Sequence, residues 1–219
     1  MKRLLLSMLV ALALTPLSRA ASVLDFNMNA VHPAGASISY GGGAAPLVGV
    51  FIGVDDVTGI GTPANNLATH VCVGCVLSFT TGASTGAWTW GGGGGSSVSI
   101  VGGIPTLGIA AGTTLMSGQF GFASISLGGA GAKVIASGFF DQKDEVLAAY
   151  YGLGGFPVWE GGFNLSFLTT ASSPDAFASS SVLSGDVFNT PVPEPASMLL
   201  LGSGLLGFAS FARKKLFKS

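Results

Sequence analysis

Residues 71–82 are VCVGCVLSFTTG, a short run of β-branched and aromatic residues that ends in Thr and Gly. Similar runs recur along the chain: GAWTWGGGGG (86–95), SSVSIVGG (96–103), TLMSGQFGFASISLGG (114–129), AKVIASGFFD (132–141) and GGFNLSFLTT (161–170). Apolar residues at every second position, between Gly-rich turns about 8–12 residues apart, are typical of strands with one buried face. We therefore expect an all-β domain, either a sandwich or a barrel-like fold.

One segment has a different pattern. Residues 141–153, DQKDEVLAAYYGL, place Asp141 as a candidate N-cap, two acidic residues in the first turn, and Gly152 after the end. We expect one short helix of about nine residues here. Its buried face would consist of Val146, Leu147 and Tyr150.

The body of the chain is acidic, although the formal net charge of the whole sequence is only −1. Between residues 22 and 190 there are nine acidic and two basic side chains, a net charge of −7. A surface so poor in Lys and Arg repels phosphate backbones, so we expect no nucleic-acid partner.

The first 20 residues have the layout of a secretory signal peptide. Lys2 and Arg3 form a positive n-region, residues 4–14 form an apolar stretch, and Ser18 and Ala20 are the small residues before a cleavage point. The apolar stretch is too short to span a bilayer comfortably. We expect cleavage after Ala20 and an exported β-rich domain over residues 22–183.

Near the other end, Gly202, Gly204 and Gly207 match the G-x-G-x-x-G pattern of dinucleotide-binding turns. That fingerprint needs a helix and a second strand after its last Gly. Because 12 residues follow Gly207, we expect no nucleotide site. Residues 196–212 are instead an uncharged run, about 25 Å long as a helix, which is the short end of the transmembrane range.

The basic cluster Arg213, Lys214 and Lys215 follows this run directly. Basic residues beside a membrane span stay on the cytoplasmic side, so the cluster predicts that the body lies outside. Residues 184–192 are expected to be a linker that holds the body away from the membrane.

Directly before the apolar run stand Pro193, Glu194 and Pro195. A Pro-Glu-Pro motif, a short apolar helix and a basic cluster, together residues 193–218, resemble the PEP-CTERM sorting signal of Gram-negative bacteria. The resemblance implies export, transient anchoring in the inner membrane and processing by an exosortase, a transpeptidase-like membrane enzyme. It also implies delivery to the cell surface or extracellular matrix, and a link to exopolysaccharide and biofilms. A plain tail anchor is the alternative.

Cys72 and Cys75 are the only cysteines of the chain. In an oxidising compartment, two cysteines three residues apart can close a small disulfide loop, and Gly74 relieves the turn. A disulfide is the interpretation that we favour. The alternatives are free thiols, a redox dithiol, or half of a zinc site with His70 as the one ligand nearby.

Two further patterns suggest weaker sites. Gly82 to Gly86 matches the G-x-S-x-G nucleophile elbow around Ser84, but both histidines precede it, against the order that this fold requires. Asp55 and Asp56 lie in a segment that we interpret as a loop, where weak calcium binding is an alternative to a solvated turn. We expect no metal and no cofactor.

Trp88 and Trp90, two residues apart, would share one face of a strand. Such a pair either belongs to the core or stacks on a sugar. The function that we expect is that of a non-enzymatic envelope or matrix protein. The alternatives are a carbohydrate-binding or carbohydrate-active domain that uses this Trp pair with surface acids, and a thiol–disulfide protein that uses the two cysteines.

Overall fold

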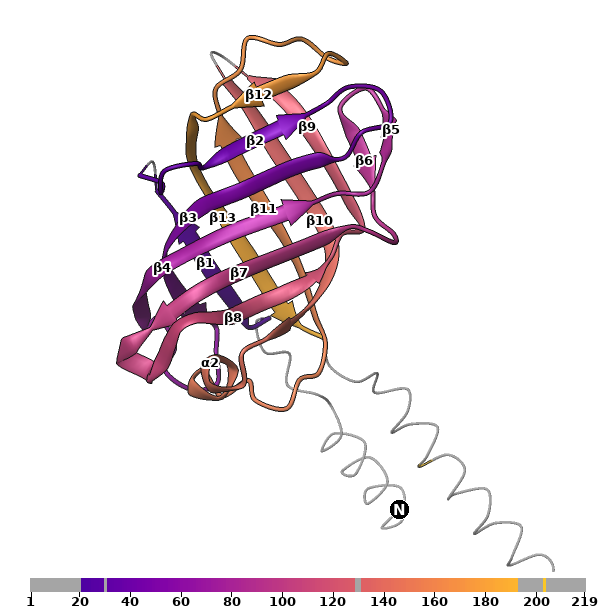
Figure 1. Ribbon diagram of the computed structural model, residues 1–219. Coiled ribbons are helices and arrows are strands. Elements are labelled where there is room, and N and C mark those ends of the chain that lie inside the picture. The colour runs from indigo at the N-terminus through magenta and orange to yellow at the C-terminus, as the bar shows by residue number, and fades with distance from the viewer. Residues whose placement is uncertain (1–20, 30, 129–130, 193–202, 204–219) are drawn as a thin grey trace, which may run out of the picture.

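The computed structural model describes residues 21–29, 31–128, 131–192 and 203, and its strands form one continuous sheet (Figure 1). A 3-10 helix, η1 (Pro105–Leu107), and a short α-helix, α2 (Glu145–Tyr150), interrupt the strands. The strands are β1 (Val23–Met28), β2 (Ser37–Tyr40), β3 (Leu47–Ile60), β4 (Thr69–Thr80), β5 (Ser84–Gly86), β6 (Thr89–Gly91), β7 (Ser97–Ile104), β8 (Ile109–Gln119), β9 (Phe122–Gly128), β10 (Gly131–Lys143), β11 (Trp159–Phe167), β12 (Phe177–Ser179) and β13 (Val182–Pro191).

The sheet closes on itself. Within the described part of the chain, eight strands follow one another in the order β11-β13-β1-β3-β4-β7-β8-β10, and β10 pairs with β11 again. The pairing that closes this ring is antiparallel, like those on either side of it. This closure confirms the all-β prediction and selects the barrel, because a sandwich consists of two separate sheets.

Two long strands change partner along their length. β3 pairs with β2 through Leu47–Val50 and with β1 through Asp56–Ile60. β10 pairs with β9 through Gly131–Ser137 and with β8 through Phe140–Lys143. The sheet is therefore extended at one end of the barrel, by β2 and β12 on one side and by β9, β6 and β5 on the other. The opposite end carries α2 (Figure 1).

The core lies inside the barrel. In β1 the buried side chains of Leu24, Phe26 and Met28 alternate with more exposed ones, and the same alternation runs along most of β11. The inward side chains of opposite walls meet in one buried cluster. Burial of one Leu or Phe side chain contributes about 1.5–3 kcal/mol, so the filled interior supplies the main driving force for folding.

Trp88 and Trp90 belong to this core, and their side chains are 1% and 0% exposed. The Trp90 ring lies edge-on to Tyr40, with 5.0 Å between ring centroids, and Trp88 packs against Phe177 at 5.4 Å. Trp88 also lies just before β6, with a φ of 49°. The alternative in which this pair contacts a sugar is therefore wrong, because neither ring presents an open face to solvent.

The helix is confirmed, but it is shorter than expected and begins later. α2 has six residues, and its N-cap is Asp144, whose carboxylate accepts a hydrogen bond from the backbone N–H of Leu147. Asp141, the predicted cap, is a buried residue of β10. The predicted buried face is also partly wrong, since Leu147 is buried but Val146 is 52% exposed.

The predicted linker over residues 184–192 is wrong. Nearly all of this segment belongs to β13, which pairs with β1 on one side and with β11 on the other. Val187, Asn189 and Pro191 are buried, at every second position of the strand. The domain thus continues to Pro191, eight residues beyond the predicted boundary. The expected signal peptide (1–20) lies outside the described residues.

Candidate functional site

The chain leaves the barrel at the end that carries α2. The last residue of β13, Pro191, is paired with Trp159, the first residue of β11. The backbone N–H of Val192 then donates a 3.0 Å hydrogen bond to the carbonyl of Val158. Pro193, Glu194 and Pro195 and the basic cluster of residues 213–215 lie outside the described residues. The described part therefore ends directly before the predicted sorting motif.

A buried ion pair lies inside the barrel near this exit. Asp141 and Lys143 both point inward from β10, their side chains are fully buried, and the ammonium of Lys143 pairs with Oδ1 of Asp141. Asn189, from β13, donates a hydrogen bond of 2.5 Å to Oδ2 of the same carboxylate. The ammonium also lies 5.1 Å from the ring centroid of Trp159, within the range of a cation–π interaction.

Burial governs the protonation of this pair. It raises the pKa of Asp141, although the charge of Lys143 opposes the shift. It also lowers the pKa of Lys143 to about 8, although the carboxylate of Asp141 opposes the shift. Each charge is thus tolerated inside the barrel because the other is present. Oδ1 of Asn189 is buried and has no hydrogen-bond partner among the described residues.

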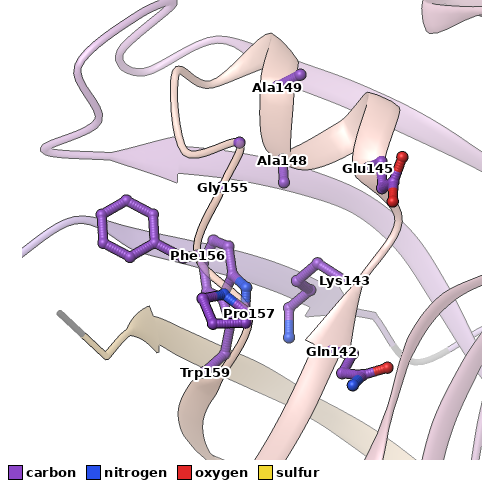
Figure 2. A pocket seen from close by; sticks show the side chains of 10 residues that line it. Gln142, Lys143, Glu145, Ala148, Ala149, Gly155, Phe156, Pro157 and Trp159 are labelled. Atoms are coloured by element: carbon purple, nitrogen blue, oxygen red, sulfur yellow. The ribbon is translucent and has the colours of Figure 1, made fainter. Parts of the chain in front are cut away.

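A pocket of about 540 Å³ opens beside this pair, between α2 and the segment 154–157 that leads into β11 (Figure 2). Lys143 and Trp159 line its inner side, and Glu145 and Phe156 line its outer parts. Because the ammonium of Lys143 is held by Asp141, it is not a free nucleophile. The pocket is a recess in the surface next to the point where the chain leaves the barrel.

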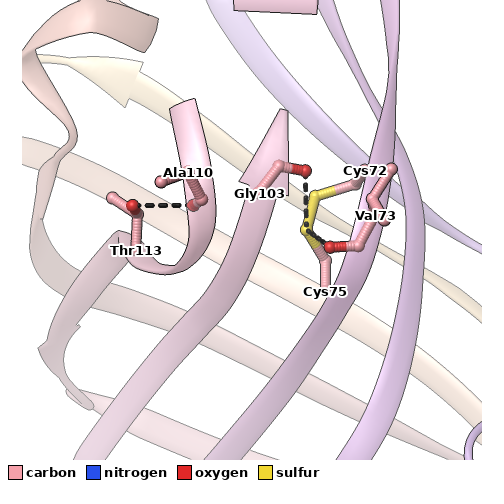
Figure 3. The surroundings of a disulfide bond; sticks show 6 residues. All are labelled: Cys72, Val73, Cys75, Gly103, Ala110 and Thr113. Atoms are coloured by element: carbon pink, nitrogen blue, oxygen red, sulfur yellow. Dashed lines mark hydrogen bonds between the residues drawn. A yellow bond between two sulfur atoms is a disulfide. The ribbon is translucent and has the colours of Figure 1, made fainter. Parts of the chain in front are cut away.

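The disulfide prediction is confirmed. Cys72 and Cys75 are bonded within β4, with 5.5 Å between their Cα atoms (Figure 3). Gly74 has a φ of +63°, which lets the strand bulge around the bridge. Sγ of Cys75 lies 3.8 Å from the carbonyl oxygen of Gly103, on the neighbouring strand β7. Both cysteines are buried, so the bridge is poorly placed to exchange with an external thiol.

The zinc alternative is not supported, because no group of three or more His, Cys, Asp or Glu side chains in the described residues could hold a metal ion. His70, the ligand considered for zinc, has Nδ1 at 2.8 Å from Oγ1 of Thr106. Its ring lies edge-on to Tyr150 at 4.7 Å. This histidine therefore joins the start of β4 to the η1 and α2 region, as a structural contact.

The loop expected around Asp55 and Asp56 is instead part of β3, which has an irregular register between Val54 and Asp56. Oδ1 of Asp56 accepts a 2.7 Å hydrogen bond from Nδ2 of Asn27, and Oδ2 of Asp55 accepts one from the backbone of Asn29. These carboxylates thus connect β3 to β1 and to the segment that follows it.

The second half of the G-x-S-x-G pattern, Ser84 to Gly86, is strand β5, which leads into the turn before β6. The hydroxyl of Ser84 donates to the carbonyls of Gly86 and Thr89, within the β5–β6 hairpin. A hydroxyl used in this way closes a local turn and is not activated by a base.

The deciding comparison concerns the end of the chain. A family model described as the PEP-CTERM protein-sorting motif matches residues 191–214. The chain therefore carries a PEP-CTERM protein-sorting motif at this end. The match begins at Pro191, which is also the last residue of β13. A search of curated proteins and a search of solved structures found no significant match to the chain.

The motif indicates that the chain is exported and processed by an exosortase at the membrane. In the described part of the chain, no helix has the length and apolar character needed to cross a membrane. The predicted span, residues 196–212, lies outside the described residues apart from Ser203.

The buried group of Asp141, Lys143 and Asn189 was missed by sequence reasoning. The signal was present, because Asp141 and Lys143 are two residues apart and the preceding residues are apolar, as in a continuing strand. The acidic residues after Asp141 suggested a helix start instead. For Asn189, inside a segment interpreted as linker, no comparable signal existed.

Proposed function

We propose that this PEP-CTERM protein is a non-enzymatic structural module of the cell envelope or extracellular matrix. In this proposal, the exosortase route delivers an acidic barrel to the cell surface or matrix, where it associates with exopolysaccharide. The matched motif at residues 191–214, attached directly to the last strand of the barrel, is the observation that carries the proposal.

Several features of the barrel support a structural role. Its interior is filled by side chains, and the buried ammonium of Lys143 is neutralised by Asp141. The candidate elbow serine closes a turn. The net charge of −7 over residues 22–190 favours a soluble, mutually repelling particle once the chain has left the membrane.

The sorting part of the proposal is tested by intact mass. In cells that contain an exosortase, we expect the released protein to lack everything after about Pro195. Glu194→Gln removes only the charge, whereas Pro193→Ala and Pro195→Ala loosen only the backbone. All three variants should leave unprocessed, folded protein in the inner membrane. A released protein that retains Arg213 to Ser219 contradicts the proposal.

The matrix part is tested separately. Purified barrel, residues 21–192, is mixed with exopolysaccharide from the producing bacterium and the two are separated by sedimentation. The proposal requires co-sedimentation above that of an unrelated protein of similar charge. Equal sedimentation of the two proteins leaves the sorting route intact but removes the link to exopolysaccharide.

A further inference from the structure

We infer that the processing enzyme docks on the end of the barrel from which the chain emerges. The surface concerned consists of the pocket rim and the residues beside β13, and is called the exit face: Glu145, Phe156, Pro157, Val158 and Glu160. The inference rests on the proposed sorting by an exosortase and adds a partner-binding surface to it.

The first step is a matter of reach. Val192 is held against Val158, and Glu194 is only two residues further along the chain. Two residues span at most about 7 Å, whatever conformation they take. A single helix with its side chains is about 10–12 Å across. An enzyme that surrounds Glu194 therefore touches the barrel, unless the end of β13 first comes away.

The second step is that the end of β13 is firmly attached. Asn189 is fully buried and hydrogen-bonded to Asp141, which is itself in the buried ion pair. Pro191 is buried opposite Trp159, whose side chain is 1% exposed. Releasing this end would break the hydrogen bond from Asn189, uncover the carboxylate–ammonium pair on β10, and break two ladders of backbone hydrogen bonds. The enzyme consequently meets a folded barrel.

The third step concerns what the exit face offers to a partner. Val158 is 41% exposed, Pro157 is exposed, and the pocket of about 540 Å³ provides a recess beside them. Both charged members of the face, Glu145 and Glu160, are acidic and exposed. Among the described residues, basic side chains do not offset this charge here, because Lys143 is buried and Lys133 lies on the part of β10 that pairs with β9.

A recess lined by both polar and apolar side chains, with acidic residues around it, is suited to a protein partner that presents a side chain for the recess and basic or hydrogen-bond-donating groups around it. The same charge disfavours an anionic lipid surface. Continuity with the sorting motif, at one residue from β13, selects the processing enzyme as the partner.

The test measures the rate at which the full chain is processed in cells that contain the exosortase, by pulse-labelling and intact mass. Eight Gly and Ser residues are inserted between Val192 and Pro193, so that the motif can be bound away from the barrel. We expect the rate to fall about fivefold, because the docking contacts no longer add to binding of the motif. The same insertion between Gly94 and Gly95, where no atom crowds the backbone, is the control and should leave the rate unchanged.

A second variant alters the face itself. Glu145→Gln with Val158→Ser should lower the processing rate about fivefold while the melting temperature stays within a few degrees. Asp175→Asn with Val31→Ser changes the same kinds of exposed side chain away from the exit, and should have no effect.

Several results would overturn the inference. If the insertion after Val192 leaves the processing rate unchanged, the barrel adds no contact to the enzyme. If the insertion raises the rate, the end of β13 has to detach before processing. If the face variant is instead retained less well in membranes without the enzyme, the face contacts lipid. If the unaltered chain is not processed and Glu194→Gln behaves identically, the proposed sorting itself fails, and the inference fails with it.

Discussion

The buried ion pair gives the most demanding test of the barrel interior. Lys143→Met removes the ammonium and leaves the carboxylate of Asp141 inside the barrel, with Asn189 as its remaining partner. Because both side chains of the pair are fully buried, removal of one partner should cost about 3–5 kcal/mol of unfolding free energy. For a domain of this size, that corresponds to a fall in melting temperature of roughly 6–20 °C.

A double variant separates the stranded charge from the lost packing. Asp141→Asn together with Lys143→Met removes both charges of the pair. The new amide can accept from Nδ2 of Asn189 and donate to its Oδ1, which has no partner in the described structure. We therefore expect the double variant to lie within about 1.5 kcal/mol of the unaltered protein, clearly above the single variant.

Urea unfolding of purified residues 21–192, followed by circular dichroism, measures all of these free energies. Lys133→Met, on an exposed part of β10, is the matched control and should change stability by less than about 0.5 kcal/mol. If Lys143→Met costs under about 1 kcal/mol, or if the double variant is less stable than the single one, the charge is not buried as described and the reasoning is refuted.

Three further predictions concern other parts of the barrel. Thiol labelling of the exported protein without reductant should detect no free sulfhydryl, and full labelling would rule out the bridge. Replacing both Cys72 and Cys75 by Ala should lower the free energy of unfolding by under about 3 kcal/mol, because the bridge closes a very short loop. Gly102→Ala should cost about 1–3 kcal/mol in urea unfolding, because the new Cβ would lie 2.5 Å from the Cα of Cys75, whereas Gly94→Ala, with open space around it, should change little. Burial, together with Asp186 and Asp56, raises the pKa of Asp25 to about 6. The folded state therefore holds this proton more tightly than the unfolded state, and stability falls as the pH rises from about 4 to 6. Asp25→Asn should consequently stabilise the protein at pH 7 but not at pH 3.5, and an equal gain at both pH values would contradict this.

The sorting motif and the strand content were determined by local sequence. Pro193, Glu194 and Pro195, the apolar run and the basic cluster are recognised by their order along the chain, which needs no tertiary contact, and the family comparison agrees. The alternation around Val98 and Leu165 is also local, because successive side chains of a strand point to opposite faces. The cysteine pairing followed from a spacing of three residues.

The extent of two strands was decided only by tertiary contacts. Asp141 and Lys143 are charged and would be expected on the outside of a barrel. Their side chains nevertheless point into the interior at the end of β10, because each charge neutralises the other. The segment from residue 184 contains Ser, Gly and Asp, like a linker, but Asn189 finds the Asp141 carboxylate from the opposite strand and Pro191 packs against Trp159. A polar residue is acceptable in a core when its partner is also there, and that partner comes from a distant part of the chain.

Closure of the barrel was likewise beyond the sequence. β10 pairs with β11, the next strand along the chain. The ring also needs β13 to pair with β1, and these strands are the last and the first in the sequence of the domain. Alternation shows which face of each strand is buried, but it does not show which strand lies beside it. The same closure places β13 in the barrel wall, because the first and last strands must pair before the ring can close. Pro193, the first residue of the Pro-Glu-Pro motif, follows β13 after one residue, so the motif is attached directly to the wall.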